Sequence, residues 1–354
     1  MSLALVVIAR DEARCIERCL ASARPWVDEM VVLDTGSRDD TVARAQAAGA
    51  RVVPFQWVDD FSAARNAALA LTQAPWRLVL DADEWLAEGG EWLRELLKTP
   101  PDFVGQVAVD SDYDDNGELR QAVSWISRLL PAGVHYEGRI HEQVVHGLPV
   151  QRVPVRVGHD GYRAAQQQRK GDRNRVLLQA ALQATPDDAY LHYQLGKDWE
   201  THEAFEQAVQ YHTQALALVP ASAPWRHDLL TRLLFCLKKT GRHAEALQLA
   251  EAELPHHQAS PDFFFALGDV LLDWAAQEPD RAGDLLPLIE SSWLRCLEIG
   301  EAPQIEGAVQ GRGSWLAAHN LAVFHQCLGQ EDAAQAYLAQ AAESRQQADE
   351  SSAH

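Results

Sequence analysis

The sequence predicts an α/β domain built on a Rossmann-like parallel sheet, followed by an all-α array of helical repeats. Three observations support this: the length of 354 residues, alternating strand and helix patterns in the first half, and a helical pattern that recurs in the second half. A chain of this length suits two domains better than one core. We expect the α/β domain at residues 1–168, the repeat domain at 169–345 and a polar tail at 346–354.

Strand and helix patterns alternate from the first residues to Asp83. The apolar run from Leu3 to Ile8 is continuous, which is typical of a strand buried on both faces of a parallel sheet. Further strands are expected at residues 30–33, 51–55 and 76–80, with helices at 16–23, 41–45 and 63–71. Short strands alternating with helices predict a parallel sheet.

The pattern becomes antiparallel after the fourth strand. Residues 104–109 and 122–130 flank Asp115-Asn116-Gly117, and Asn-Gly is typical of a hairpin turn because both residues tolerate positive φ angles. Another apolar strand is expected at residues 153–157. The sheet is therefore expected to be mixed.

The second half repeats the spacing of the tetratricopeptide consensus, about 34 residues long, in which small residues lie where paired helices approach closely. The first unit contains Leu195-Gly196, Trp199, Ala208, His212, Ala215 and Pro220. The second unit contains Leu233, Leu237 and Ala246, and the fourth contains Leu321-Ala322, His325, Ala334, Leu338 and Ala341. The third begins at Leu267-Gly268 and Leu271 and resumes at residues 293–299 after an insertion with Pro and Asp. Four such units predict a superhelix of helix pairs.

The composition argues against several classes of partner. A formal net charge of -20 repels phosphate backbones and anionic lipid, so we expect neither nucleic acid nor a membrane surface as the partner. The five cysteines include no C-x-x-C pair, and we expect Cys15 and Cys19 to be buried small residues. The first apolar stretch is too short for a signal peptide or a membrane span, which predicts a cytoplasmic protein.

Asp81 and Asp83 directly follow an apolar strand. Ligands of open α/β sheets bind at the carboxyl ends of strands. Carboxylate oxygens there suit Mg²⁺ or Mn²⁺, which complete their shells with water and phosphate oxygens. Two acids with this spacing also occur in solvated turns, so the surrounding motifs decide the interpretation.

Four segments in order resemble glycosyltransferase family 2: V-I-A-R-D-E-A at residues 7–13, V-L-D-T-G-S-R-D-D-T at 32–41, W-V-D-D-F-S-A-A-R-N at 57–66 and L-D-A-D-E at 80–84. The variant is similar to the subgroup of β-glucosyltransferases and peptide S-glycosyltransferases, some of which carry helical repeats. The resemblance extends over residues 2–162 and implies a GT-A fold and a UDP-sugar donor.

The resemblance places these residues around the nucleotide sugar: Ala9, Glu12, Asp34, Thr35, Arg65, Asp81, Ala82 and His141. Ala9 and Glu12 would edge the base pocket. Many members of the family carry an acid in place of Thr35, so the contact to the uracil N–H passes to Asp34, which otherwise is an Asx-turn acid at a strand end. Arg65 would either pair with Asp60 or reach the diphosphate.

The resemblance also implies a metal site of Asp83, Asp81 and His159, in which Asp83 binds the ion and Asp81 holds the ribose or a metal-bound water. A histidine from a late loop often completes such a shell, and neutral imidazole is an acceptable Mn²⁺ ligand. Packing at a strand end is the other interpretation of His159. Glu84 is expected to cap a following helix.

An inverting transfer needs a base beside the acceptor, because the attacking hydroxyl or protein nucleophile must lose a proton. Residues 136–142, Y-E-G-R-I-H-E, supply candidates. We expect Glu142 to be the base, with Glu137 as the second candidate and a surface acid as the alternative interpretation. His141 would touch phosphate or acceptor, or pack in the core.

The sequence therefore predicts an inverting transferase that moves glucose or N-acetylglucosamine from a UDP-sugar to a saccharide or to a protein or peptide, with Mn²⁺ or Mg²⁺. The repeats would bind the acceptor or hold a homodimer together. The alternative is a non-catalytic tetratricopeptide scaffold with a degenerate transferase domain. A nucleotidyltransferase is disfavoured because no Gly-rich, Lys-bearing loop follows the first strand.

Overall fold

The computed structural model describes residues 1–115, 118–159 and 164–352. The chain divides into two compact units, Met1–Ala181 and Leu182–His354. The predicted boundary at residues 168–169 lies inside helix α5 (Ala164–Ala184), most of which belongs to the first unit. The boundaries predicted from the sequence therefore remain a proposal.

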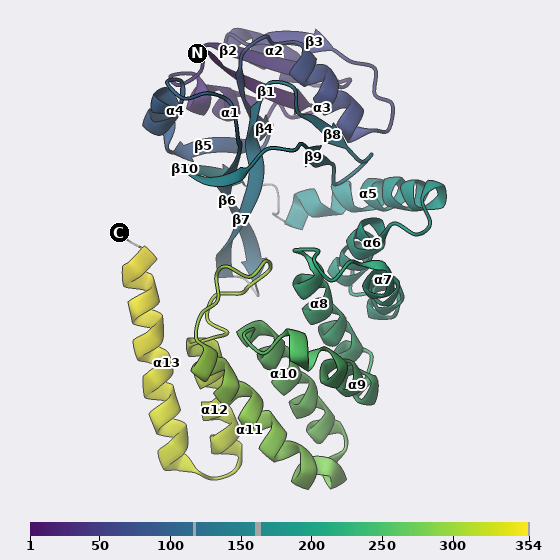
Figure 1. The fold of residues 1–354 in the computed structure, drawn as a ribbon, viewed down its shortest axis with the longest axis vertical. Helices are drawn as coiled ribbons and strands as arrows, with labels where there is room; N and C mark the ends of the chain where they lie inside the picture. Colours follow the sequence, from purple (N-terminus) through teal and green to yellow (C-terminus); the bar gives the residue numbers. More distant parts are fainter. Residues whose placement is uncertain (116–117, 160–163, 353–354) are drawn as a thin grey trace. The chain divides into compact units, whose positions relative to one another are not determined.

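The first unit contains an eight-stranded mixed sheet with the strand order β3-β2-β1-β4-β7-β6-β10-β5 (Figure 1). Its parallel part confirms the four predicted strands: β1 (Leu3–Ala9), β2 (Glu29–Asp34), β3 (Arg51–Pro54) and β4 (Trp76–Asp81). β7 (Glu118–Pro131) continues the sheet antiparallel to β4. The Rossmann-like GT-A architecture predicted from the sequence is confirmed.

The two faces of the sheet bury different helices, as the alternation of side chains along a strand requires. Leu3, Leu5 and Val7 of β1 pack in a core cluster with α1 (Ile16–Ala23), α2 (Thr41–Ala47) and α4 (Gly90–Leu96). Ala4 and Val6 pack on the opposite face with α3 (Phe61–Ala70). The continuous apolar run of β1 therefore reflects burial on both sides.

The sheet beyond β4 is more extensive than the sequence suggested. β6 (Val104–Asp115) pairs antiparallel with β7, and β10 (Val150–His159) lies parallel to β6 and antiparallel to β5 (Glu84–Glu88). The predicted turn residues Asn116 and Gly117 lie outside the described residues. The prediction that Glu84 caps a helix is wrong, because Glu84 begins β5. A separate two-stranded sheet pairs β8 (His135–Glu137) with β9 (Gln143–Val145).

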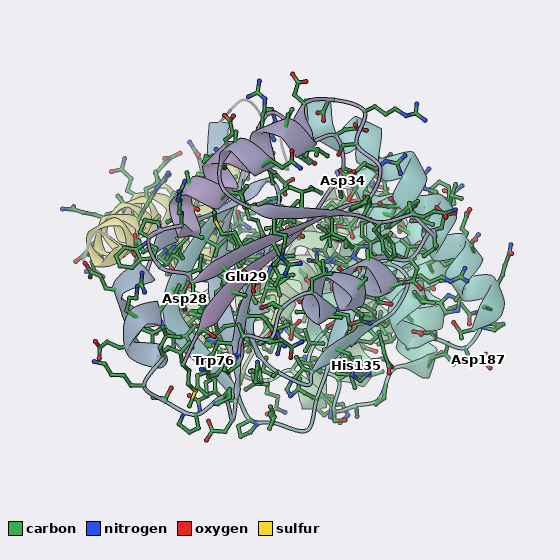
Figure 2. The ribbon with its side chains drawn as sticks, turned by 90° about the horizontal axis from the view of Figure 1, so that it is seen from above. Asp28, Glu29, Asp34, Trp76, His135 and Asp187 are labelled. Atoms are coloured by element: carbon green, nitrogen blue, oxygen red, sulfur yellow. The ribbon has the colours of Figure 1, made fainter. Side chains whose placement is uncertain are left out.

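The parallel strands end at one edge of the sheet. Figure 2 shows Glu29, the first residue of β2, and Trp76, the first residue of β4, well apart from Asp34, the last residue of β2. In the registers of β1 with its two neighbours, Ala9 pairs with Asp34 and Ile8 pairs with Asp81. The predicted nucleotide residues of three strands therefore meet at this carboxyl edge.

The second unit consists of four helix pairs, one for each predicted repeat (Figure 1). The pairs are α6 (Ala189–Thr201) with α7 (Phe205–Leu218), α8 (Arg226–Lys239) with α9 (His243–Glu253), α10 (Pro261–Gln277) with α11 (Ala282–Ile299), and α12 (Trp315–Cys327) with α13 (Glu331–Ser352). A side chain at Gly196 or Gly268 would collide with the ring of His212 or Trp293. Glycine is required there because paired helices approach closely.

Two details of the helical half differ from the expectation. The predicted insertion in the third repeat is largely helical, since α11 continues from Ala282 to Ile299 with Pro287 inside it after a short 3₁₀ turn at Pro279–Arg281. The longest interruption comes after α11 instead, at residues 300–314. Residues 346–352 of the predicted tail continue α13, so they are helical.

Within the described ranges, no helix combines the length and apolar character needed to cross a membrane. Cys15 and Cys19 are 2% and 0% exposed, which confirms that they are buried residues of the sheet domain. Both thiols are free in the structure.

The contact between Gly158 of β10 and Trp85 of β5 supports the strand that carries Glu84. A Cβ atom at residue 158 would lie 2.2 Å from Cζ2 of Trp85. We expect Gly158→Ala to lower the free energy of unfolding by about 1–3 kcal/mol, because overpacking must displace the indole. Urea denaturation measures this. Gly147→Ala is the matched control, since a Cβ atom at residue 147 would have no other atom within 4 Å; equal stability of the two variants would contradict the prediction.

Candidate active site

The loops after β1 and β2 are held together by hydrogen bonds between the first two sequence motifs. The hydroxyl of Thr41 accepts from the backbone N–H of Glu12 at 2.7 Å, and Asp39 accepts from that of Ala13 at 3.1 Å. Asp11, which has a φ of 54°, accepts from the backbone N–H of Arg38 at 2.7 Å. These hydrogen bonds between the two motifs hold the loops in place at the carboxyl edge of the sheet.

Asp34 and Thr35 use their side chains in this loop structure. The carboxylate of Asp34 accepts from the backbone N–H groups of Gly36 and Ser37 at 3.2–3.3 Å, which is the Asx-turn arrangement. The hydroxyl of Thr35 donates to the backbone carbonyl of Ala9 at 3.2 Å, and both residues are buried. The structure brings Ala9, Asp34 and Thr35 together, with Asp34 as the acid at the strand end.

Glu12 lies beside the buried thiol of Cys15. The thiol donates to Oε2 of Glu12 at 3.1 Å, and burial together with this carboxylate raises the pKa of Cys15 well above its usual range. Cys15 therefore remains a thiol at neutral pH. Glu12 therefore lies in the loop between β1 and α1 with its carboxylate against Cys15.

Asp81 lies between two guanidinium groups. Nη2 of Arg65 donates to its Oδ1 at 2.7 Å, and Nη2 of Arg128 donates to its Oδ2 at 2.6 Å. Burial disfavours the charged carboxylate, but Arg128 and Arg65 outweigh burial and hold the pKa of Asp81 well below its usual range. Of the two alternatives for Arg65, the pairing with Asp60 is wrong, because Asp60 caps α3 by accepting from the backbone N–H of Ala63.

Glu84 completes this ion network from β5. Its Oε1 accepts from Nη2 of Arg128 at 2.5 Å, and its Oε2 accepts from the backbone N–H of Asp81 at 2.8 Å. The Glu84 side chain is 3% exposed, and burial raises its pKa although Arg128 opposes the effect. Arg128 therefore joins the end of β4 to the first residue of β5.

Asp83 and His159 lie side by side. Asp83 is 5% exposed, and Nε2 of His159 lies 3.6 Å from its Oδ2. His159 is the ladder partner of Glu84 between β10 and β5, which sets its position. Burial works against the charged imidazole, but the carboxylates of Asp83, Glu84 and Asp81 outweigh it and raise the pKa of His159. This corner of the site attracts positive charge.

The third motif also positions the predicted base loop. The side chain of Asn66 donates to the backbone carbonyl of Tyr136 and accepts from its N–H, each at 2.8 Å. Nε of Arg65 donates to Oε1 of Glu142, whose side chain is 10% exposed. Helix α3 thus holds both ends of residues 136–142 and places Glu142 next to the guanidinium that also binds Asp81.

Four other residues of this loop, Glu137, Gly138, Arg139 and His141, are exposed, whereas Tyr136 and Ile140 are buried. The side chain of Glu137 is 68% exposed and lies 3.2 Å from Nε2 of His135. His141 is exposed and has a φ of 52°, while Gly138 turns the loop with a φ of 99°. Ala82 packs its methyl group in the core between the two acids. Glu142 is therefore the loop acid that the structure brings to Asp81, and Glu137 is not.

The sequence interpretation missed Arg128 and Asn66. Arg128 is an isolated basic residue in an expected hairpin strand, and nothing local to it points to a partner 47 positions earlier. Asn66 belongs to a recognised motif, but its role depends on a strand 70 positions later. The signal for Arg128 in the sequence was that it is a charged residue near the end of an otherwise apolar strand. A charged residue is rarely buried without a partner.

Residues 4–142 match the family described as Glycosyl transferase family 2. The N-terminal domain of this chain belongs to glycosyltransferase family 2. The match includes the carboxyl edge of the sheet, Arg65, Asp81, Asp83, Arg128 and Glu142. The helix pairs that follow this transferase domain resemble tetratricopeptide repeats.

Two curated relatives are similar to the chain. A TPR repeat-containing protein of Synechococcus elongatus is 35% identical over 269 residues, which is 71% of this chain and 66% of that protein. The glycosyltransferase SunS of Bacillus subtilis is 25% identical over 240 residues, or 65% of this chain and 57% of SunS. The chain therefore spans less than two thirds of the length of these relatives.

Among solved structures, glucosyl-3-phosphoglycerate synthase of Mycobacterium tuberculosis, in complex with Mn²⁺, uridine diphosphate and glucosyl-3-phosphoglycerate, is 31% identical. The similarity extends over 32% of this chain and 44% of that protein, with a TM-score of 0.26.

The ion network predicts that Arg128 is a stability determinant of the transferase domain. In Arg128→Met, Glu84 would stay buried without its cation, and we expect the free energy of unfolding to fall by about 3 kcal/mol. Adding Glu84→Gln removes the uncompensated charge and should recover a large part of the loss in a double-mutant cycle. Urea denaturation of the variants checks this, and a double variant no more stable than Arg128→Met would contradict it.

Proposed function

We propose that the chain is an inverting glycosyltransferase that moves a hexose, glucose or N-acetylglucosamine, from a UDP-sugar to a saccharide or to a protein or peptide. The observation that carries this proposal is the acid cluster at the carboxyl edge of the sheet, where Asp83, His159 and Glu142 converge around the Asp81 ion network. In a family 2 transferase domain, this edge is the place where a ligand of the sheet would bind.

The donor atoms of Asp83 and His159 fit a divalent cation. A buried carboxylate and an imidazole 3.6 Å apart offer one oxygen and one nitrogen ligand, a set compatible with Mn²⁺. Asp81 fits less well as a direct ligand, because both of its oxygens accept from guanidinium groups. We assign the metal to Asp83 and His159, and to Asp81 the role of holding the ribose or a bound water. A bound metal would supply Lewis-acid stabilisation of the diphosphate.

Glu142 is the proposed base. Its Oε1 accepts from Arg65, which orients the carboxylate and leaves Oε2 to take a proton from the attacking acceptor group. Arg65 donates to Asp81 through Nη2 at the same time, so one guanidinium sets the geometry of both the donor side and the acceptor side of the reaction. His141 and Glu137 are exposed on the same loop, where they would contact the acceptor as it enters the site.

Ala9, Glu12, Asp34 and Thr35 would surround the uracil and ribose at the ends of β1 and β2. The repeats would bind the acceptor, since stacked helix pairs expose an extended surface. The retention of Asp81, Asp83 and the motif at residues 57–66 favours the enzyme over a degenerate scaffold.

The metal assignment is tested with Asp83→Ala. We expect Mn²⁺-supported binding of UDP to weaken by about tenfold or more, equivalent to about 1.4 kcal/mol, because the buried carboxylate no longer binds the ion. Isothermal titration of UDP with and without Mn²⁺ measures the change. Asp102→Ala, at an exposed acid of the same domain, is the control. Unaltered UDP and metal affinity in Asp83→Ala would refute this assignment, and a parent protein that binds neither would refute the proposed function.

The base assignment is tested with Glu142→Gln. The amide keeps an oxygen for Arg65 but cannot accept the proton, so we expect kcat for UDP release from the sugar donor to fall by about 100-fold or more while UDP affinity is kept. In Glu137→Gln we expect a change of about twofold or less, as for other exposed positions. The opposite ranking of the two variants would move the base to Glu137.

A further inference from the structure

Three side chains from three helices converge inside the repeat unit. They are Glu200 of α6, His212 of α7 and Cys236 of α8, and one ligand atom from each lies within 4.8 Å of the other two. His212 and Cys236 are both 0% exposed, whereas Glu200 is partly exposed. Within the described parts of the chain, this is the one group of three or more acidic, histidine or cysteine side chains that meets this spacing.

Three buried polar atoms of this group lack hydrogen-bonding partners. Neither ring nitrogen of His212 has one, and neither does Oε2 of Glu200, which lies 3.5 Å from Nε2 of the ring. The ring is held in place by Gly196, where a Cβ atom would lie 2.4 Å from ring atom Cε1. A buried polar group without a partner destabilises the fold, so this arrangement calls for a ligand that satisfies His212 and Oε2 of Glu200.

The charges of the group suit a dication. Burial lowers the pKa of His212, so the imidazole is neutral and its nitrogen lone pair is available. Burial, followed by the Glu200 carboxylate, raises the pKa of Cys236 to about 12, so the thiol keeps its proton until a cation displaces it. A dication with one thiolate, one carboxylate and one imidazole forms a neutral centre, which limits the cost of burying charge.

A contact with Arg232 orients the carboxylate of Glu200. Nη1 of Arg232 donates to Oε1 of Glu200 at 3.0 Å, while Nε of Arg232 donates to Asp228 at 2.7 Å. Oε1 is therefore occupied, and Oε2 is the oxygen that faces His212. Partners that orient ligands in this way are typical of metal sites.

We propose that Glu200, His212 and Cys236 bind one zinc-type transition-metal ion through a carboxylate oxygen, an imidazole nitrogen and a thiolate. Zn²⁺ takes this mixture of ligands in tetrahedral sites, and a fourth position remains for water on the side of the partly exposed Glu200. Binding breaks the S–H bond of Cys236 and releases its proton to solvent. The ion would join α6, α7 and α8 and so tie the first helix pair to the second. This site is independent of the proposed transferase chemistry.

The test uses the full-length chain, freed of metal with a chelator and titrated with Co²⁺. We expect one Co²⁺ per chain to produce the near-ultraviolet charge-transfer band of a cobalt thiolate, with Zn²⁺ displacing it and raising the midpoint of thermal unfolding. Asp83→Ala should keep the band, because the transferase-domain ligands are oxygen and nitrogen. Loss of UDP binding would therefore contradict the proposed function, whereas loss of the thiolate band would contradict this metal site. Absence of a thiolate band in the parent protein, as expected if a buried water bridges Glu200 and His212 instead, would overturn the proposal.

Matched variants locate the ligands. Cys236→Ser should lose the thiolate band, while Cys296→Ser should keep it, because Cys296 is equally buried in α11 but lies outside the group. His212→Phe refills the space against Gly196 and should unfold as cooperatively as the parent, but without a response to Zn²⁺. Survival of the band in Cys236→Ser, or a Zn²⁺-induced shift in His212→Phe equal to that of the parent, would assign the metal elsewhere and overturn the site.

Discussion

The pairing of two buried arginines with the acids at the end of β4 is the interaction on which the transferase domain depends. Arg65 and Arg128 are 7% and 6% exposed, and both donate to Asp81. Burying a charge is costly unless it is paired, so these groups can be buried only together. The pairing links α3, β4, β7 and β5, and the candidate site is assembled at the point where these elements meet.

The same network explains how an acid-rich edge remains folded. Asp81, Asp83, Glu84 and Glu142 lie close together in a chain of net charge -20, and their mutual repulsion would open the loops without compensating cations. The two guanidinium groups neutralise the acids on one side, while His159 lies beside Asp83 on the other. The side next to Asp83 is therefore the part of the edge where additional positive charge is most favourable, which is consistent with the proposed metal position.

The core of the helical half differs from the charged network of the transferase domain. It is formed by apolar contacts between helix pairs, and glycine allows His212 and Trp293 to lie flat against a neighbouring helix. A neutral histidine without hydrogen bonds is unusual in such a core, because apolar rings would fill the same space without cost.

Local patterns in the sequence determined the parallel strands, the helix pairs and the position of Asp81 and Asp83, because apolar periodicity and strand ends depend on neighbouring residues. Only the tertiary structure decided that Glu84 begins a strand, that Arg128 reaches Asp81, and that Asn66 holds the loop carrying Glu142. These contacts join positions far apart in the chain: the pairing of antiparallel strands places Glu84 and Arg128, and the packing of α3 against β8 places Asn66. Charge pairing across a sheet has no local periodicity, so the sequence by itself could supply the candidates but not their partners.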